Sequence, residues 1–224
     1  MFAGGIGLTL LFAAADWLVV FTHKNRLKYI TKPLVMLVLF LWLYLETGLL
    51  GFTLFFGIGI LFSLLGDIWL MLSRRFFLAV LFSFLLAHVS YIVGLNQTPL
   101  PFSTLSLVVG TTVFLIAILL FCKIRFGFMR MISTLRARFP LALYGLVLTL
   151  MLMSAISTLF RGDWNTSAAW MVSTGALLFF ISDNLLGFDR FVKPFRHSRL
   201  LVRITYHLGQ VILMTGVFSQ YHTL

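Results

Sequence analysis

Eight apolar runs, each near the length that spans a bilayer, constrain the fold of this chain more than any other feature. A helix needs roughly 20 apolar residues to cross the hydrocarbon core. The runs are continuous, whereas the strands of a membrane barrel alternate apolar and polar positions. The sequence therefore predicts an all-α integral membrane protein, a single polytopic domain over residues 1–224 with about eight transmembrane helices. The expected spans are 4–22, 33–50, 52–72, 76–96, 103–122, 140–160, 166–187 and 201–219.

Composition supports this class and excludes several others. Charged residues make up 10% of the 224 residues, against roughly 25% in a typical soluble domain. The formal net charge is +11, but the loops leave no room for a nucleic-acid-binding domain, so we expect no nucleic-acid partner. The single Cys122 excludes an intramolecular disulfide and a cysteine metal cluster.

The basic residues are confined to alternate loops. All of the 17 Lys and Arg residues except Arg161 fall after the first, third, fifth or seventh run. Cytoplasmic loops carry an excess of Lys and Arg. The pattern therefore predicts that both termini lie on the non-cytoplasmic side. We expect a multi-pass protein of a bacterial inner (plasma) membrane.

Two aspartates in matching local sequence indicate a functional site. Asp67 lies in segment 66–70 and Asp183 in segment 182–186, each seven residues before the first arginine of a basic loop. At about 1.5 Å per residue, both carboxylates lie roughly 10 Å inside the cytoplasmic boundary. Acidic side chains inside a membrane are costly and mark functional sites by default. The sequence predicts paired carboxylates in a cavity that opens to the cytoplasmic leaflet. The similarity of the two segments has two possible explanations: duplication of a unit of four helices, or chance.

Other polar residues fall in the same inner half of the membrane or near its midplane. We expect His88 at the floor of the cavity, with Tyr91 one turn further along its helix. The remaining candidates are Asp16, Asn184, Tyr206, His207 and Gln210.

Each of these candidates also has a simpler interpretation. Asp16 could be a structural partner of Lys24 or of a neighbouring helix. His88 could form a hydrogen bond between helices. Asn184 could be a packing amide or a support for Asp183, and the three polar residues of the last run could simply be hydrated.

A set of short motifs resembles the YhhN-like lysoplasmalogenase family. The motifs occur in order and over most of the chain: Lys32-Pro33, Gly66-Asp67-x-x-Leu70, Ala87-His88-x-x-Tyr91, Ser182-Asp183-x-x-Leu186 and Tyr206-x-x-x-Gln210. The resemblance implies hydrolysis of the vinyl-ether bond of a lysoplasmalogen, an alkenyl glycerophospholipid without an sn-2 chain. The products would be a fatty aldehyde and glycerophosphoethanolamine or glycerophosphocholine. It also implies that the partners are a lysophospholipid substrate and membrane lipid.

The chemistry of the residues fits this reaction. Vinyl-ether cleavage begins with protonation of the β-carbon, which gives an oxocarbenium ion that water then attacks. Two carboxylates in a low-dielectric site titrate apart, so that one stays protonated. We hypothesise that Asp67 and Asp183 form this acid/base pair, with His88 and Tyr91 orienting the water or the head group. Lys32, at the inner membrane boundary, is a candidate for the phosphate. The reaction needs no metal and no cofactor.

Two alternatives belong to other functional classes. A metal-dependent hydrolase of the ceramidase-like kind would use His88, His207 and the aspartates as ligands, and it would lose activity with a chelator. A proton-coupled transporter or lipid flippase would use buried carboxylates as a proton relay. It would show uptake or lipid scrambling in proteoliposomes without product formation.

Overall fold

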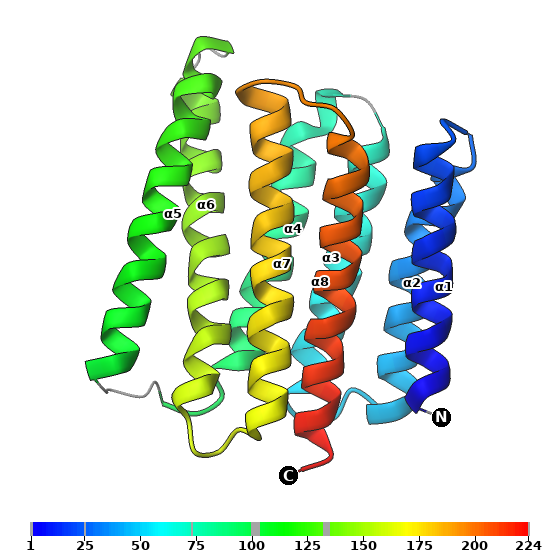
Figure 1. Cartoon of the computed structure of the whole chain (residues 1–224), viewed down its shortest axis with the longest axis vertical. Coiled ribbons are helices and arrows are strands. Elements are labelled where there is room, and N and C mark those ends of the chain that lie inside the picture. The colour runs from blue at the N-terminus through cyan, green and yellow to red at the C-terminus, as the bar shows by residue number, and fades with distance from the viewer. Residues whose placement is uncertain (1, 25, 73, 100–103, 132–134, 224) are drawn as a thin grey trace.

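The described residues form a bundle of eight long helices that run up and down in sequence order (Figure 1). The computed structural model describes residues 2–24, 26–72, 74–99, 104–131 and 135–223, and no strand occurs in these ranges. Short 3-10 turns follow α3 at Arg74–Phe76 and α6 at Thr158–Phe160. The helices are α1 (Phe2–Phe21), α2 (Lys28–Thr47), α3 (Thr53–Met71), α4 (Phe77–Leu95), α5 (Thr104–Met131), α6 (Leu135–Ser157), α7 (Thr166–Phe191) and α8 (Ser198–Tyr221).

The all-helical membrane class predicted from the apolar runs is confirmed. Seven of the described helices are long and apolar enough to cross a membrane, and in α5 the apolar part is Thr104–Leu120. The expected span 103–122 starts at a residue outside the described ranges, and its helix continues to Met131. Large apolar side chains stay exposed along the bundle, as lipid-facing side chains do; Leu11, Leu45 and Leu119 are 65%, 67% and 66% exposed.

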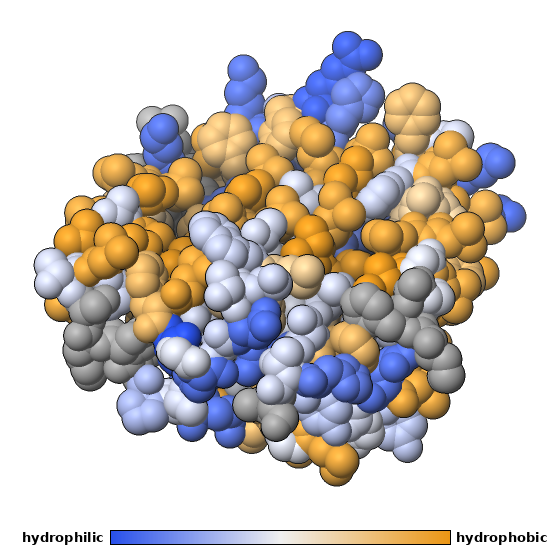
Figure 2. Space-filling model, turned by 60° about the horizontal axis from the view of Figure 1, so that its bottom comes forward, coloured by the Kyte–Doolittle hydropathy of each residue, from blue (hydrophilic) through white to orange (hydrophobic). Residues whose placement is uncertain are grey.

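The two ends of the bundle are polar and its flank is apolar. Both termini lie at one end, and the loops that follow odd-numbered helices lie at the other (Figure 1). Figure 2 shows hydrophilic side chains gathered on the end that carries the termini, with hydrophobic side chains along the flank. The basic loops therefore share one end. Its assignment to the cytoplasm stays a prediction.

Glycines bring α7 and α8 into direct backbone contact. A Cβ on Gly175 would lie 2.4 Å from the backbone nitrogen of Leu213, and one on Gly209 would lie 2.9 Å from that of Phe179. Small residues at helix interfaces in membranes allow this close approach, which stabilises the pair through packing. These contacts fix α7, which carries Asp183, against α8.

We expect Gly175→Ala to destabilise the protein by about 1–3 kcal/mol, because the added methyl group meets backbone atoms that cannot rotate away. The measurement is the thermal unfolding midpoint in detergent. Gly7→Ala is the matched control, since a Cβ there would have no atom within 4 Å. Equal midpoints for the two variants would contradict the close approach of α7 and α8.

Candidate active site

Asp183 forms a hydrogen-bonded cluster with side chains from two other helices. The Tyr144 hydroxyl, on α6, donates to Asp183 Oδ2. His88 Nε2, on α4, lies 3.3 Å from the same oxygen and 3.3 Å from the Tyr144 hydroxyl. The His88 side chain is fully buried, and its Nδ1 has no hydrogen-bond partner in the described part of the chain. This favours the tautomer whose proton is on Nε2, where it can be donated to the carboxylate.

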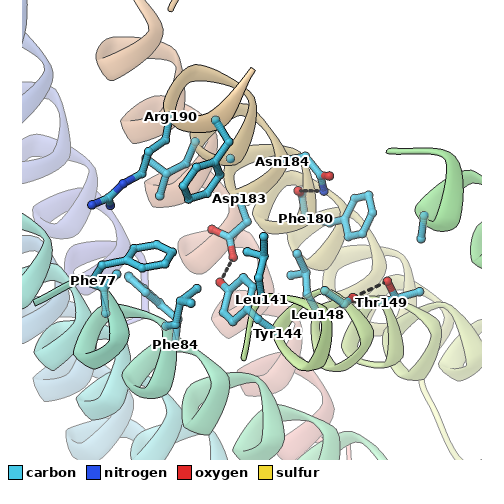
Figure 3. A pocket seen from close by; sticks show the side chains of 17 residues that line it. Phe77, Phe84, Leu141, Tyr144, Leu148, Thr149, Phe180, Asp183, Asn184 and Arg190 are labelled. Atoms are coloured by element: carbon cyan, nitrogen blue, oxygen red, sulfur yellow. Dashed lines mark hydrogen bonds between the residues drawn. The ribbon is translucent and has the colours of Figure 1, made fainter. Parts of the chain in front are cut away.

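Asp183 and Tyr144 line an apolar pocket between α4, α5, α6 and α7, and His88 lies behind them. The pocket holds about 80 Å³, and Figure 3 shows apolar side chains such as Phe84 and Leu148 around it. The second oxygen of Asp183 points away from Tyr144 into this space (Figure 3). Arg190 also lines the pocket, with its guanidinium 4.5 Å from the centre of the Phe77 ring. The Asp183 carboxylate, whose side chain is 9% exposed, therefore borders a space lined mainly by apolar side chains.

Asn184 lies on the same pocket wall. Its side-chain amide donates to the backbone oxygen of Phe180 at 2.8 Å, one turn earlier on α7. This is a local contact within the helix, so the amide is a wall group rather than a partner of Asp183.

Asp67 forms a separate buried cluster with Lys32. The Lys32 ammonium lies 2.6 Å from Asp67 Oδ1, and the two side chains are 5% and 1% exposed. The expected position of Lys32 at the inner membrane boundary stays a prediction, but its side chain is enclosed by the bundle. Helix α2 begins at Lys28 rather than at residue 33, so Lys32 lies one turn inside the helix and is buried. Asp67 provides the countercharge that makes this burial tolerable.

The two aspartates do not touch each other. No ion pair or hydrogen bond joins Asp67 to Asp183 among the residues that the structure describes. Aromatic rings lie between the clusters: the Lys32 ammonium is 5.8 Å from the Tyr206 ring, Tyr206 is 5.2 Å from Phe179, and Phe179 is 4.8 Å from His88, measured to ring centres. The site thus consists of two polar clusters joined by aromatic packing.

Tyr91 and Gln210 connect three helices in the core. The Tyr91 hydroxyl donates to Gln210 Oε1 at 2.9 Å, and Gln210 Nε2 donates to Ser63 at 3.0 Å. The ring of Tyr91 fits against Gly59, where a Cβ would lie 2.1 Å from it. The network ties α3, α4 and α8 together and supports both clusters.

The last helix carries its polar residues inside the bundle. Tyr206 is 4% exposed, and His207 and Gln210 are fully buried, so the alternative that these side chains are merely hydrated was wrong. His207 Nδ1 accepts a hydrogen bond from the Trp17 indole at 3.1 Å, which links α8 to α1.

Asp16 has structural partners on neighbouring helices, which was one of the two alternatives that the sequence left open. Arg203 Nη1 lies 2.5 and 2.6 Å from its two carboxylate oxygens, and the Thr31 hydroxyl donates to it at 2.6 Å. Arg203, rather than Lys24, therefore balances its charge.

Two residues of the polar clusters were not predicted as site residues, although the sequence contains an indication of each. Tyr144 carries a hydroxyl group inside the apolar run 140–160, just as Tyr91 carries one inside the run 76–96. Arg203 was counted among the loop cations, although it falls within the expected span 201–219. An arginine inside a span points to a buried acidic partner, which is Asp16.

The proposed metal ligands are not gathered in one place. His88 contacts Asp183, whereas His207 contacts Trp17. Within the described ranges, no group of three or more His, Cys, Asp or Glu side chains could hold a metal ion.

A second, larger cavity lies at the end of the bundle that carries the basic loops. It holds about 580 Å³ and is lined by residues of α1, α2, α3, α7 and α8 and of the loops beside them. Leu186 lines both this cavity and the apolar pocket, so the two spaces flank the same stretch of α7.

Comparison with known proteins identifies relatives over most of the chain. The YhhN family matches residues 27–217. Lysoplasmalogenase TMEM86B of Mus musculus is 30% identical over 183 residues, which cover 82% of this chain and 71% of the mouse protein. The Rattus norvegicus lysoplasmalogenase TMEM86B is 30% identical over 182 residues, 81% of this chain and 68% of its own. The Sus scrofa protein of the same name is 32% identical over 161 residues, 71% of this chain and 61% of its own. No solved structure matches the chain.

Proposed function

The chain belongs to the YhhN family, and from this premise we propose that it is a membrane-embedded hydrolase of the lysoplasmalogenase type. It cleaves the vinyl-ether bond of an alkenyl lysophospholipid to a fatty aldehyde and a glycerophospho-alcohol. The observation that carries the proposal is the Asp183 carboxylate, which is held by Tyr144 and His88 on the wall of an apolar pocket. The basic end of the bundle faces the cytoplasm, so the lysolipid enters from the cytoplasmic leaflet.

The first step is protonation of carbon. The protonated Asp183 carboxyl gives its proton to the β-carbon of the alkenyl chain, whose π electrons form the new C–H bond. The ether oxygen shares its lone pair and becomes part of an oxocarbenium ion. The carboxylate left behind stabilises this cation, because opposite charges interact strongly in a site that excludes water.

The second step is addition of water. Water attacks the α-carbon and gives its proton to the Asp183–His88 pair, which leaves a neutral hemiacetal. The pair then returns that proton to the glycerol oxygen as its bond to the α-carbon breaks, and the hemiacetal hydroxyl loses its own proton as the aldehyde C=O forms. That proton restores the acid. A positioned acid/base group contributes typically 10²–10⁴-fold to such steps.

The aspartates then have different roles. Asp183 is the proton donor. Asp67 holds Lys32 at the wall of the large cavity through their 2.6 Å ion pair, and so supports binding rather than proton transfer. Tyr91, Gln210 and Tyr206 keep α4 and α8 in the arrangement that places His88 against Asp183.

The test is aldehyde release by the purified protein in detergent, with 1-alkenyl lysophosphoethanolamine as substrate. We expect aldehyde with and without a chelator, and none from the saturated 1-alkyl analogue, which has no double bond to protonate. In D₂O, an aldehyde trapped at once by reduction should carry one deuterium at carbon 2, because that carbon receives the acid's proton.

Two other results would favour a different function. Activity that disappears with the chelator would favour the metal-dependent hydrolase. A well-folded protein that releases no aldehyde, but takes up solute or scrambles lipid in proteoliposomes, would favour the transporter.

A further inference from the structure

The large cavity has the charge and shape of an anion site. Among the described residues, five cationic side chains line it: Lys24, Lys28, Lys32, Arg199 and Arg203. Asp189 is the acidic residue of the lining, and one of its oxygens accepts a hydrogen bond from the backbone N–H of Phe195 at 3.3 Å.

Two of these cations are already balanced by buried carboxylates. Lys32 pairs with Asp67, and Arg203 pairs with Asp16. Lys24, Lys28 and Arg199 form no ion pair within the part of the chain that the structure describes. The cavity therefore presents an excess of positive charge, and Arg and Lys are the side chains that recognise phosphate.

Two residues that line this cavity have left-handed backbone angles. His23 and His197 both line it, and both adopt left-handed backbone angles, with φ of 57° and 59°. Such angles are unfavourable for residues other than glycine and cluster at binding sites, where the surrounding structure enforces them. The two histidines directly precede Lys24 and Ser198, which also line the cavity.

The rule that basic loops face the cytoplasm explains which end these residues occupy, but it does not explain why they surround a cavity. Lys193 and Arg196, between α7 and α8, are exposed and do not line the cavity, whereas Arg199, which is also exposed and lies at the start of α8, does line it. The basic segment 193–199 thus contains a cation that lines the cavity and cations that do not, and the second group supplies matched controls.

We propose that this cavity binds the phosphate of the lysolipid head group while the alkenyl end of the same molecule enters the apolar pocket beside Asp183. The inference rests on the proposed function. Only a few bonds separate the phosphate from the vinyl ether in a lysoplasmalogen. Leu186 lines both spaces, so the two lie beside one another along α7, and the proposed ligand passes this side chain.

The kinetic test uses Lys28→Gln and Arg199→Gln, with Lys193→Gln and Arg196→Gln as controls. We expect each cavity variant to raise KM for 1-alkenyl lysophosphoethanolamine about tenfold, which is the effect of losing one charge-assisted contact, with kcat nearly unchanged. The controls should behave as wild type. With 1-alkenylglycerol, which lacks the phosphate, all variants should match wild type. Equal KM for cavity and control variants would overturn the proposal.

A binding test separates this inference from the proposed reaction. The probe is a non-hydrolysable 1-alkyl lysophosphocholine, and the readout is the ligand concentration that half-saturates the thermal stabilisation of the protein. We expect Lys28→Gln and Arg199→Gln to raise this concentration even if wild type releases no aldehyde, in which case only the proposed reaction fails. Normal aldehyde release with unchanged binding by these variants would overturn the phosphate site alone.

A competition arm identifies the source of the phosphate. Soluble glycerophosphoethanolamine should displace the lysolipid only weakly, because it lacks the tail that occupies the apolar pocket. If it competed as tightly as the lysolipid, the cavity would be a site for soluble phosphate esters, and the head-group assignment would be wrong.

Discussion

Replacing Asp183 with Asn is expected to lower aldehyde release about 10²–10⁴-fold, the range found when a positioned general acid is lost. The amide has nearly the same shape as the carboxyl group, and its oxygen can still accept the hydrogen bond from Tyr144. It has no proton of suitable acidity to give to the β-carbon. The loss should therefore appear in kcat, measured with 1-alkenyl lysophosphoethanolamine, while the thermal unfolding midpoint stays close to that of wild type.

Two further variants sharpen this test. Glu46→Gln changes another helix carboxylate, partly exposed on α2 and remote from both cavities, and it should retain full activity. Tyr144→Phe removes the hydroxyl that holds Asp183, and it should lower kcat less than Asp183→Asn does, with KM little changed. If Asp183→Asn kept most of the activity while a folded Asp67→Asn had none, the proton donor would be Asp67 instead.

The helices were predictable because a bilayer leaves the backbone few choices. Inside lipid every N–H and C=O must be bonded within the protein, so a long apolar run becomes a helix. The residues at which the helices begin and end were less predictable. Helix α2 starts at Lys28 and α5 continues to Met131, both beyond the apolar runs. A helix can extend past the hydrocarbon with polar residues, and hydropathy carries no information about where it stops.

The position of each aspartate along its helix could be predicted from the sequence, but the partners of each residue could not. The rise per residue is fixed, so Asp67 and Asp183 were placed near the same end of their helices, as the structure has them. Rotation about each helix axis depends on packing against its neighbours. This is why Tyr144 as the partner of Asp183, and Lys32 as that of Asp67, emerged only from the three-dimensional arrangement.

Close packing explains some of the contacts that could not be predicted from the sequence. The missing side chain of Gly59 provides the space for the Tyr91 ring. That ring places its hydroxyl on Gln210, 119 residues away along the chain. A glycine indicates that something approaches closely, and only the fold shows what approaches.

Lys32→Met is expected to destabilise the protein by roughly 3–5 kcal/mol, because it leaves the Asp67 carboxylate buried without its countercharge. Methionine has a similar length and preserves most of the packing of the lysine stem, so the loss reports charge rather than a cavity. The measurement is denaturant or thermal unfolding in detergent. Lys28→Met, one turn earlier on α2 and without an ion pair in the described ranges, should change stability by no more than about 0.5 kcal/mol.

The double variant Lys32→Met/Asp67→Asn decides whether the cause is electrostatic. Removing the uncompensated carboxylate should recover much of the lost stability, because replacing both members of a buried ion pair costs far less than breaking it. If the double variant were as unstable as Lys32→Met alone, packing of the lysine stem rather than charge compensation would be what Lys32 contributes to the stability of the bundle.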